Sequence, residues 1–134
     1  DWLFVEDHAK AIDMVQEQGR LFETYNVGGH NEKQNIEIIN IIIDTLQEML
    51  PADDPRRALV SKDLITYVED RKGHDRRYAI APDKIKAEIG WYPETDFATG
   101  IKKTIAWFFE HEDWMKNVTS GDYQKYYEDM YANK

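Results

Sequence analysis

The apolar residues of this chain recur mainly with helical spacing, and its strand-like runs are only a few residues long. The clearest case is the segment 36–50, whose evenly spaced apolar positions are Ile39, Ile42, Ile43, Leu46 and Leu50. Asn35 can cap this helix, and Pro51 ends it because proline cannot continue a helix. One face of the helix is therefore expected to be buried.

Further helices are predicted over residues 9–18, 82–89 and 97–110, and a last one over about 123–131. Gly19 is expected to end the first of these in a left-handed conformation, and Gly90 to end the second. Short strands are predicted at 3–5, 24–27 and 64–68, which are rich in β-branched and aromatic residues, and a surface loop at 52–63. The expected fold is mostly helical, with too few strands for a sizeable sheet.

Length and charge limit the possible functions. The 134 residues suit one domain, and 17 basic against 26 acidic side chains give a net charge of −9. This charge repels phosphate, so neither nucleic acid nor an anionic membrane surface is expected as a partner. No apolar run approaches the roughly 20 residues of a membrane-spanning helix. The absence of cysteine excludes a disulfide scaffold and a thiolate nucleophile, and it is typical of a cytoplasmic protein.

The chain begins Asp1-Trp2-Leu3-Phe4-Val5, without an initiator methionine or a signal-peptide core. We therefore expect it to be a piece of a longer protein. It contains no glycine-rich dinucleotide or phosphate fingerprint, and no tyrosine is followed four residues later by lysine. The four histidines are too dispersed to suggest a metal site. We expect no catalytic residue and no metal ligand in this chain.

A basic turn stands out against the acidic background. Residues 70–77 read Asp-Arg-Lys-Gly-His-Asp-Arg-Arg, directly after a predicted strand. Guanidinium groups bind phosphate oxygens in pairs, and a glycine lets a ligand approach the backbone, so Arg71 and Gly73 could help to clamp a diphosphate. The alternative is a solvated loop in which Asp70 and Asp75 neutralise their neighbours.

A second polar stretch, residues 28–35, separates a predicted strand from the helix at 36–50. Asn35 lies where the free backbone N–H groups of a helix start favour an anion. The alternative is that Asn35 is only the helix cap.

Three longer strings resemble the dTDP-glucose 4,6-dehydratases, a family of extended short-chain dehydrogenases. The strings are Asp1-Trp2-Leu3-Phe4-Val5-Glu6-Asp7-His8, then Tyr25-Asn26-Val27-Gly28-Gly29-His30-Asn31-Glu32, then Asp70-Arg71-x-Gly73-His74-Asp75-Arg76-Arg77-Tyr78-Ala79-Ile80. Gly90-Trp91-x-Pro93 and the stretch from Trp114 to Tyr123 continue the match in order. The likeness covers essentially the whole chain.

The resemblance implies an α/β enzyme in which a Rossmann domain, absent here, holds NAD, and residues 1–134 form the C-terminal nucleotide-sugar-binding domain. Such enzymes oxidise C4 of dTDP-glucose, eliminate water across C5 and C6, and return the hydride to C6. By position, Asn35 and Arg71 match residues that hold the diphosphate. Asp70, Lys72, Gly73 and His74 line the same pocket, and Tyr131 matches a peripheral contact. The parent is expected to be a cytoplasmic homodimer, and this chain alone inactive.

One position departs from the family pattern: Lys72 stands where the family usually has proline, so the turn is expected to be less rigid and more basic. Two other functions remain open. One is a related nucleotide-sugar epimerase or decarboxylase, which would need different residues at 70–78, and fold-level kinship permits many chemistries. The other is an acidic helical module that binds a protein partner through its aromatic face.

Overall fold

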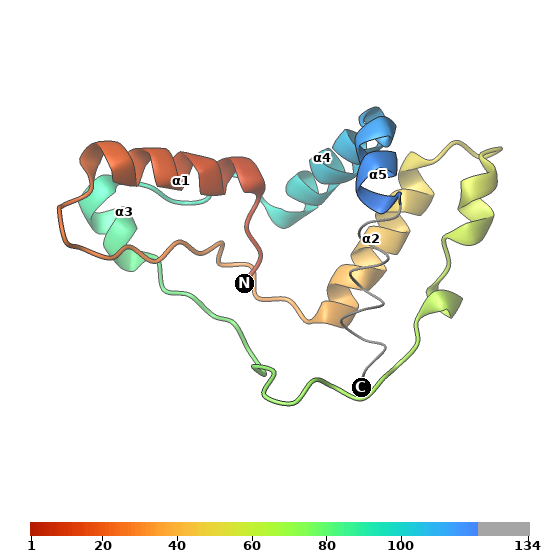
Figure 1. Cartoon of the computed structure of the whole chain (residues 1–134), viewed down its shortest axis with the longest axis horizontal. Coiled ribbons are helices and arrows are strands. Elements are labelled where there is room, and N and C mark those ends of the chain that lie inside the picture. Colours follow the sequence, from red (N-terminus) through yellow and green to blue (C-terminus); the bar gives the residue numbers. More distant parts are fainter. Residues whose placement is uncertain (121–134) are drawn as a thin grey trace. The chain divides into compact units, whose positions relative to one another are not determined.

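Helices make up the regular structure of residues 1–120, the part of the chain that the computed structural model describes. They are α1 (Val5–Gln18), α2 (Asn35–Met49), α3 (Asp83–Ile89), α4 (Phe97–Glu110) and α5 (Glu112–Thr119), with two short 3-10 helices, η1 (Pro55–Leu59) and η2 (Lys62–Leu64) (Figure 1). The chain divides into two compact units, one of residues 1–101 and one that begins at Lys102.

The predicted short strands are wrong for this part of the chain. Residues 24–27 and 65–68 are extended without ladder partners, and Val5 is already the first residue of α1. Tyr67 and Val68 are more than four-fifths exposed, so their side chains find no sheet on which to pack. High strand propensity describes a side chain that fits a half-buried sheet, and the described residues supply no such sheet.

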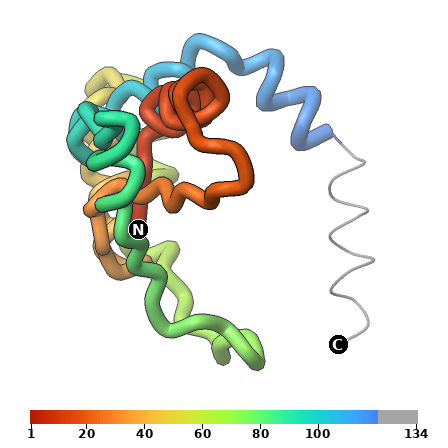
Figure 2. Tube along the Cα trace, turned by 90° about the vertical axis from the view of Figure 1, so that its left-hand side faces the viewer, coloured from red at the N-terminus to blue at the C-terminus, as the bar shows by residue number. Residues whose placement is uncertain are grey.

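The core of the first unit lies between α1, α3 and the segment that follows α3. Ala11 of α1 is fully buried against Ile85, Ile89 and Trp91. Leu3, Met14, Val15, Tyr25 and Val27 pack around this cluster. In Figure 2 α1 is seen almost end-on, with the segment after it folding back beneath the helix. Segment 24–27 therefore reaches the core through two side chains, although it forms no strand.

Asp7 joins α1 to the segment after α3. This buried carboxylate accepts a hydrogen bond from the Thr95 backbone N–H at 2.9 Å, and its own backbone carbonyl accepts one from the Trp91 indole at 3.1 Å. These bonds satisfy polar groups that would otherwise be left unpaired near the core, where an unmade hydrogen bond is costly. Asp7 is thus a structural residue rather than a catalytic acid.

The helix predictions come close. α4 has the predicted bounds, and α2 is shifted by one residue, so that Asn35 is its first residue and Gln34 its cap. Gly90 does end α3, with φ 78°. The prediction for Gly19 is wrong, because its backbone is extended (φ −65°, ψ 144°) and the positive φ falls instead at Phe22, at 64°.

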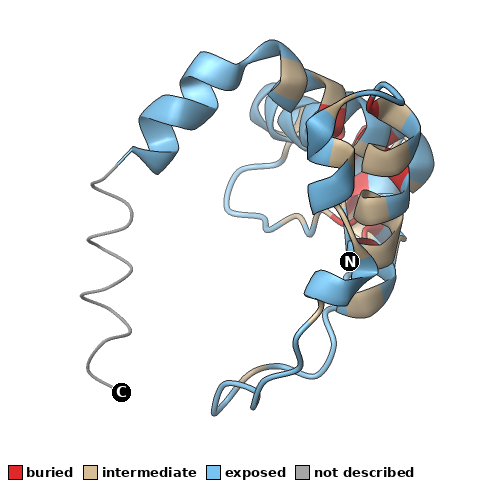
Figure 3. Cartoon of the chain, turned by 90° about the vertical axis from the view of Figure 1, so that its right-hand side faces the viewer, coloured by how far each residue is buried: buried red, intermediate tan, exposed pale blue. Residues whose placement is uncertain are grey.

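The predicted loop at 52–63 is more ordered than expected, because it is tied to α2 by polar side chains. Gln47 donates to the carbonyls of Arg57 and Val60, and Arg57 donates to the carbonyl of Leu50 at 2.9 Å. These bonds accompany η1 and η2. From 66 to 81 the chain is exposed except at His74, as the long loop at the bottom of Figure 3 shows.

The second unit contains most of α4 and all of α5, which the sequence did not predict. Trp107 contacts Phe108 and Trp114 edge-on, at centroid distances of 5.4 Å and 5.2 Å, and stacks on His111 at 4.2 Å. His111 lies between the two helices, and its Nδ1 is 2.7 Å from the Trp107 carbonyl. The helix predicted over about 123–131 lies outside the described residues.

Candidate functional site

Three segments that are distant in sequence meet at the N-terminal residues. The Asp1 carboxylate Oδ1 accepts hydrogen bonds from the backbone N–H groups of Gly29 and Asn31, both at 3.1 Å. The Trp2 N–H donates to the Asn31 carbonyl at 3.1 Å, and the Asp1 nitrogen lies 3.0 Å from the Tyr78 carbonyl. These contacts fix the loop before α2 and the end of the 70–78 turn against the same short segment.

This close approach requires a glycine at position 29. A Cβ atom there would lie 2.1 Å from the Trp2 carbonyl oxygen, a backbone atom that cannot rotate away. Glycine has no Cβ, so the two backbones can touch. The sequence Gly28-Gly29 thus brings the loop before α2 against the N-terminal segment.

A cavity of about 940 Å³ opens beside this junction. Its walls come from the N-terminal segment, the loop before α2, the first turn of α2 and the basic turn, through Asp1, Trp2, residues 32–35, Glu37, Asp70 and residues 74–78. It is large enough for a ligand of nucleotide size, since ligand pockets typically span about 300–1,000 Å³. We call it the basic-turn cavity.

The basic turn is organised around the Asp70 carboxylate. Its Oδ1 lies 2.7 Å from the Arg71 backbone nitrogen, which donates to it, and 2.8 Å from Nδ1 of His74. These two hydrogen bonds, that of His74 first, lower the pKa of Asp70 below its usual range. Gly73 has φ 76°, a conformation that glycine adopts without strain, and the turn closes with a bond from the His74 N–H to the Arg71 carbonyl.

The start of α2 is capped from within the chain. The Gln34 backbone N–H donates to the Glu37 carboxylate at 2.7 Å. An acidic group at this end also suits the helix dipole. An anion that approached the start of α2 would therefore be attracted by the free N–H groups and repelled by the Glu37 carboxylate. Basic side chains across the cavity would have to offset this repulsion for the anion to bind.

Charges of both signs line the basic-turn cavity, and several are already paired. Arg77 lies 3.4 Å from Glu32, which joins the two loops. The Asp75 carboxylate raises the pKa of the Tyr78 phenol, while Arg71 acts in the opposite direction. The Nζ atom of Lys33 lies 5.5 Å from the centre of the Phe97 ring.

The structure brings only some of the predicted site residues to this cavity. Asn35, Asp70 and His74 line it, whereas Arg71, Lys72 and Gly73 lie in the same turn but outside the lining. The predicted contact Tyr131 lies outside the described residues. Whether any of these side chains binds a ligand stays a prediction.

Sequence reasoning missed four lining residues, Asp1, Trp2, Glu37 and Tyr78. Trp2 and Tyr78 reach the cavity through the long-range bonds of Asp1, which no local pattern reveals. Glu37 carried a usable signal, because an acidic residue three positions after a helix cap is a recognised capping pattern.

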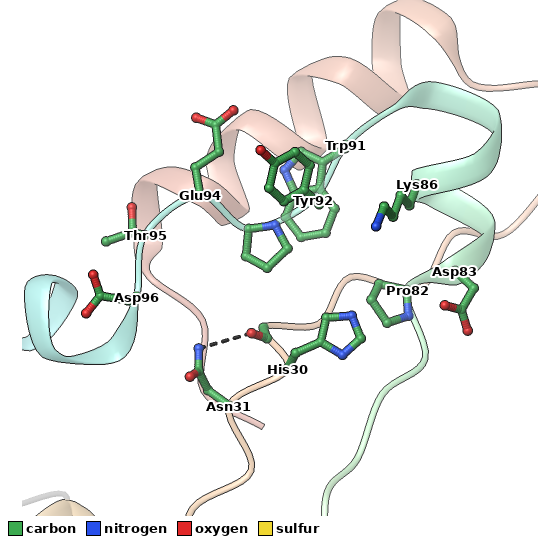
Figure 4. Close-up of a pocket in the computed structure, with 12 residues that line it drawn as sticks. His30, Asn31, Pro82, Asp83, Lys86, Trp91, Tyr92, Glu94, Thr95 and Asp96 are labelled. Carbon is green, nitrogen blue, oxygen red and sulfur yellow. Dashed lines mark hydrogen bonds between the residues drawn. The ribbon is translucent and has the colours of Figure 1, made fainter.

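A second, smaller pocket of about 370 Å³ lies between α3, the segment 91–96 and the loop 29–31 (Figure 4). His30 and Lys86 point into it, and Lys86 lies 5.9 Å from the centre of the Tyr92 ring. Two of its carboxylates are already bonded: Glu94 to Lys10 at 2.6 Å, and Asp96 to Thr99. These bonds already engage two of the three carboxylates that line this pocket.

Residues 1–120 contain neither a metal-ion cluster nor a membrane-spanning helix. No three His, Asp or Glu side chains gather where they could share a metal ion. None of the helices in this part of the chain has the length and apolar character needed to cross a bilayer.

Comparison with known proteins gives the family. The sequence profile described as GDP-mannose 4,6 dehydratase matches residues 1–104. The whole chain is 48% identical to the dTDP-glucose 4,6-dehydratase of Shigella flexneri and 47% identical to dTDP-glucose 4,6-dehydratase 1 of Escherichia coli K12. It spans only 36% of the length of either relative.

Solved structures agree. A crystal structure of dTDP-glucose 4,6-dehydratase from Bacillus anthracis in complex with NAD is 42% identical, with a TM-score of 0.73, over 89% of this chain and 34% of that one. The Streptomyces venezuelae dTDP-glucose 4,6-dehydratase with NAD and TYD bound is 33% identical, with a TM-score of 0.72, over 85% of this chain and 32% of that one. The resemblance seen in the sequence is confirmed. The chain belongs to the GDP-mannose 4,6 dehydratase family and is homologous, over its whole length, to dTDP-glucose 4,6-dehydratases.

Proposed function

We propose that this chain is the nucleotide-sugar-binding part of a dTDP-glucose 4,6-dehydratase. The observation that carries the proposal is the 48% identity that extends across all 134 residues to a dTDP-glucose 4,6-dehydratase. The basic-turn cavity supports it, because Asn35 and the turn around Asp70 and His74 face one space of nucleotide size.

In this proposal the diphosphate lies against the basic turn. Arg71 is exposed, and its side chain forms no ion pair within residues 1–120, so its guanidinium group is free to bind two phosphate oxygens. Arg76 adds positive charge within the cavity wall. Asn35 at the start of α2 and Lys72 in the turn supply further donors at the edge of the site.

NAD would not be held by this chain. Residues 1–120 contain no strand, and no glycine-rich turn leads from a strand into a helix, which is how dinucleotides are commonly bound. We propose that a preceding Rossmann domain of the parent binds NAD, which supplies hydride transfer when bound. In the parent, a cytoplasmic homodimer, the reaction would convert dTDP-glucose to dTDP-4-keto-6-deoxyglucose. No step of that reaction is assigned to residues of this chain.

Isothermal titration of the purified chain with dTDP-glucose tests the proposal, with GDP-mannose as the matched competitor of the same charge class. Saturable binding of dTDP-glucose in preference to GDP-mannose supports the assignment. Equal binding of the two, or none of dTDP-glucose, contradicts it. The described residues that line the cavity all lie within the first unit.

A further inference from the structure

The imidazole of His74 stands apart from the rest of the exposed loop. Between residues 66 and 81 it alone is partly buried, with 23% of its side chain exposed. It lines the basic-turn cavity, and its Nδ1 is held 2.8 Å from the Asp70 carboxylate. One ring nitrogen, Nδ1, is therefore hydrogen-bonded to Asp70, and the other, Nε2, has no hydrogen-bond partner within residues 1–120.

This arrangement fixes what each nitrogen can do. An ionised carboxylate only accepts hydrogen bonds, so the Nδ1 atom beside Asp70 must carry a proton. In the neutral ring Nε2 is then a bare acceptor, and it can donate only when the imidazole is protonated. A diphosphate ester is also an acceptor without protons near neutral pH. Nε2 of neutral His74 and the diphosphate oxygens are therefore both acceptors, so no hydrogen bond can form between them.

We propose that Asp70 is a positioning residue, which holds His74 so that Nε2 donates to the ligand's diphosphate only when the imidazole is protonated. Binding of the nucleotide sugar is accordingly coupled to the uptake of a proton by His74. The inference rests on the proposed function, since the anion is the diphosphate of dTDP-glucose. It adds a pH dependence that the family assignment does not contain.

Other charged and titratable groups line the cavity and also act on a bound anion. From the other segments these are Asp1, Glu32, Lys33 and Glu37. Within the basic turn they are Asp75, Arg76 and Arg77, with the phenol of Tyr78. Apart from His74, only the α-amino group of Asp1 is of a type that ordinarily changes charge between about pH 5 and 8. A change in affinity across this range that is lost in His74→Gln therefore reports on His74.

Titration of the chain with dTDP-glucose at about pH 5.5 and about pH 8 tests the proposal. We expect binding about tenfold tighter at the lower pH, as a charge-assisted hydrogen bond is gained. Near neutral pH, the binding heat should also differ between two buffers of unequal ionisation enthalpy, because a proton is taken up. Equal affinities at the two pH values would overturn the inference.

Two variants separate positioning from simple structure. His74→Gln keeps a polar side chain but cannot titrate, so it should abolish the pH dependence and the buffer dependence. Asp70→Asn keeps an acceptor for Nδ1 but removes the negative charge beside the ring, so the difference in affinity between the two pH values should become smaller. His8→Gln is the matched control, because His8 is exposed on α1 outside the cavity and should change nothing.

The possible outcomes distinguish a failure of this inference from a failure of the proposed function. An undiminished pH dependence in His74→Gln, or an unchanged difference in affinity between the two pH values in Asp70→Asn, would refute the roles given to these residues. If dTDP-glucose fails to bind at every pH, the proposed function fails and the inference falls with it. If it binds with unchanged affinity and no proton uptake, the proposed function stands and only the inference is lost.

Discussion

Asp7 and Thr95 are 88 residues apart in sequence, yet the Asp7 carboxylate accepts a hydrogen bond from the Thr95 backbone N–H at 2.9 Å. The contact attaches the segment that leads into α4 to the first turn of α1. Its acceptor is 5% exposed, so water cannot readily replace it. A single side chain thus joins two parts of the first unit that no regular structure connects.

Removing this acceptor should destabilise the first unit. We expect Asp7→Ala to lower the free energy of unfolding by about 1–3 kcal/mol, because the Thr95 N–H is left without a partner. Asp7→Asn retains an acceptor oxygen and should lose less. Urea denaturation measures both, and Glu6→Ala, at an exposed neighbour on α1, should change stability by less than about 0.5 kcal/mol. Equal losses for Asp7→Ala and Glu6→Ala would contradict the structural role.

Two glycine substitutions should lower the free energy of unfolding by different amounts. Gly29→Ala places a Cβ atom 2.1 Å from the Trp2 carbonyl and must push two backbones apart, at a cost of at least about 2 kcal/mol. In Gly73→Ala the new Cβ atom has no other atom within 4 Å. The variant should therefore lose only the roughly 1 kcal/mol of stability that a positive φ costs a residue with a side chain. Thermal unfolding of the two variants gives the order, and a larger loss at Gly73 would count against the close contact at Gly29.

Arg71→Lys should weaken dTDP-glucose binding nearly as much as Arg71→Ala, because lysine cannot form two parallel hydrogen bonds to a diphosphate. The expected loss is about 1.5–3 kcal/mol, or roughly one to two decades in affinity. Arg76→Ala is the local control and should cost less. Calorimetric titration at low and high salt distinguishes the cases, because a close contact survives screening. If the substitutions at both arginines weaken binding slightly and equally, and only at low salt, the turn is a solvated loop and does not clamp the diphosphate.

The effect of Asp75 on Tyr78 should appear in a pH titration. Since Asp75 raises the pKa of Tyr78, the phenol should ionise above its ordinary value of 10.0. The raised value belongs to the folded state, so any stability from this interaction is fully present below that ordinary value and is lost as the pH rises through the folded pKa. The tyrosinate absorbance that Tyr78→Phe removes identifies the group. Asp75→Asn should lower the midpoint of Tyr78, and an unchanged midpoint would show that Asp75 does not act on the phenol.

Local patterns predicted the helices well and the strands badly. α4 was predicted to the residue and α2 to within one, because helical periodicity and terminators such as Pro51 are local signals. Strands depend on partners far along the chain, and none pairs with 24–27 or 65–68 within residues 1–120. α5 was missed because its apolar residues are interspersed with charges in a segment of only eight residues.

The same distinction holds for the candidate site. The basic turn was visible in the sequence because its charges are contiguous and stand out against an acidic chain. The cavity was not, because Asp1 creates it through contacts with Asn31 and Tyr78, which lie 30 and 77 residues away. The pairing of Asp70 with His74 follows from the backbone path of the turn, in which Gly73 adopts a positive φ.

The central claim is that the basic-turn cavity binds dTDP-glucose. Backbone amide spectra of the isotope-labelled chain, recorded by NMR during titration with dTDP-glucose, test it most directly. The account predicts saturable shifts concentrated at Asn35, at residues 70–78 and at residues 32–34, with no 4-keto sugar formed when NAD is added. Shifts confined to the pocket around His30 and Lys86, or the absence of any saturable shift, would contradict it.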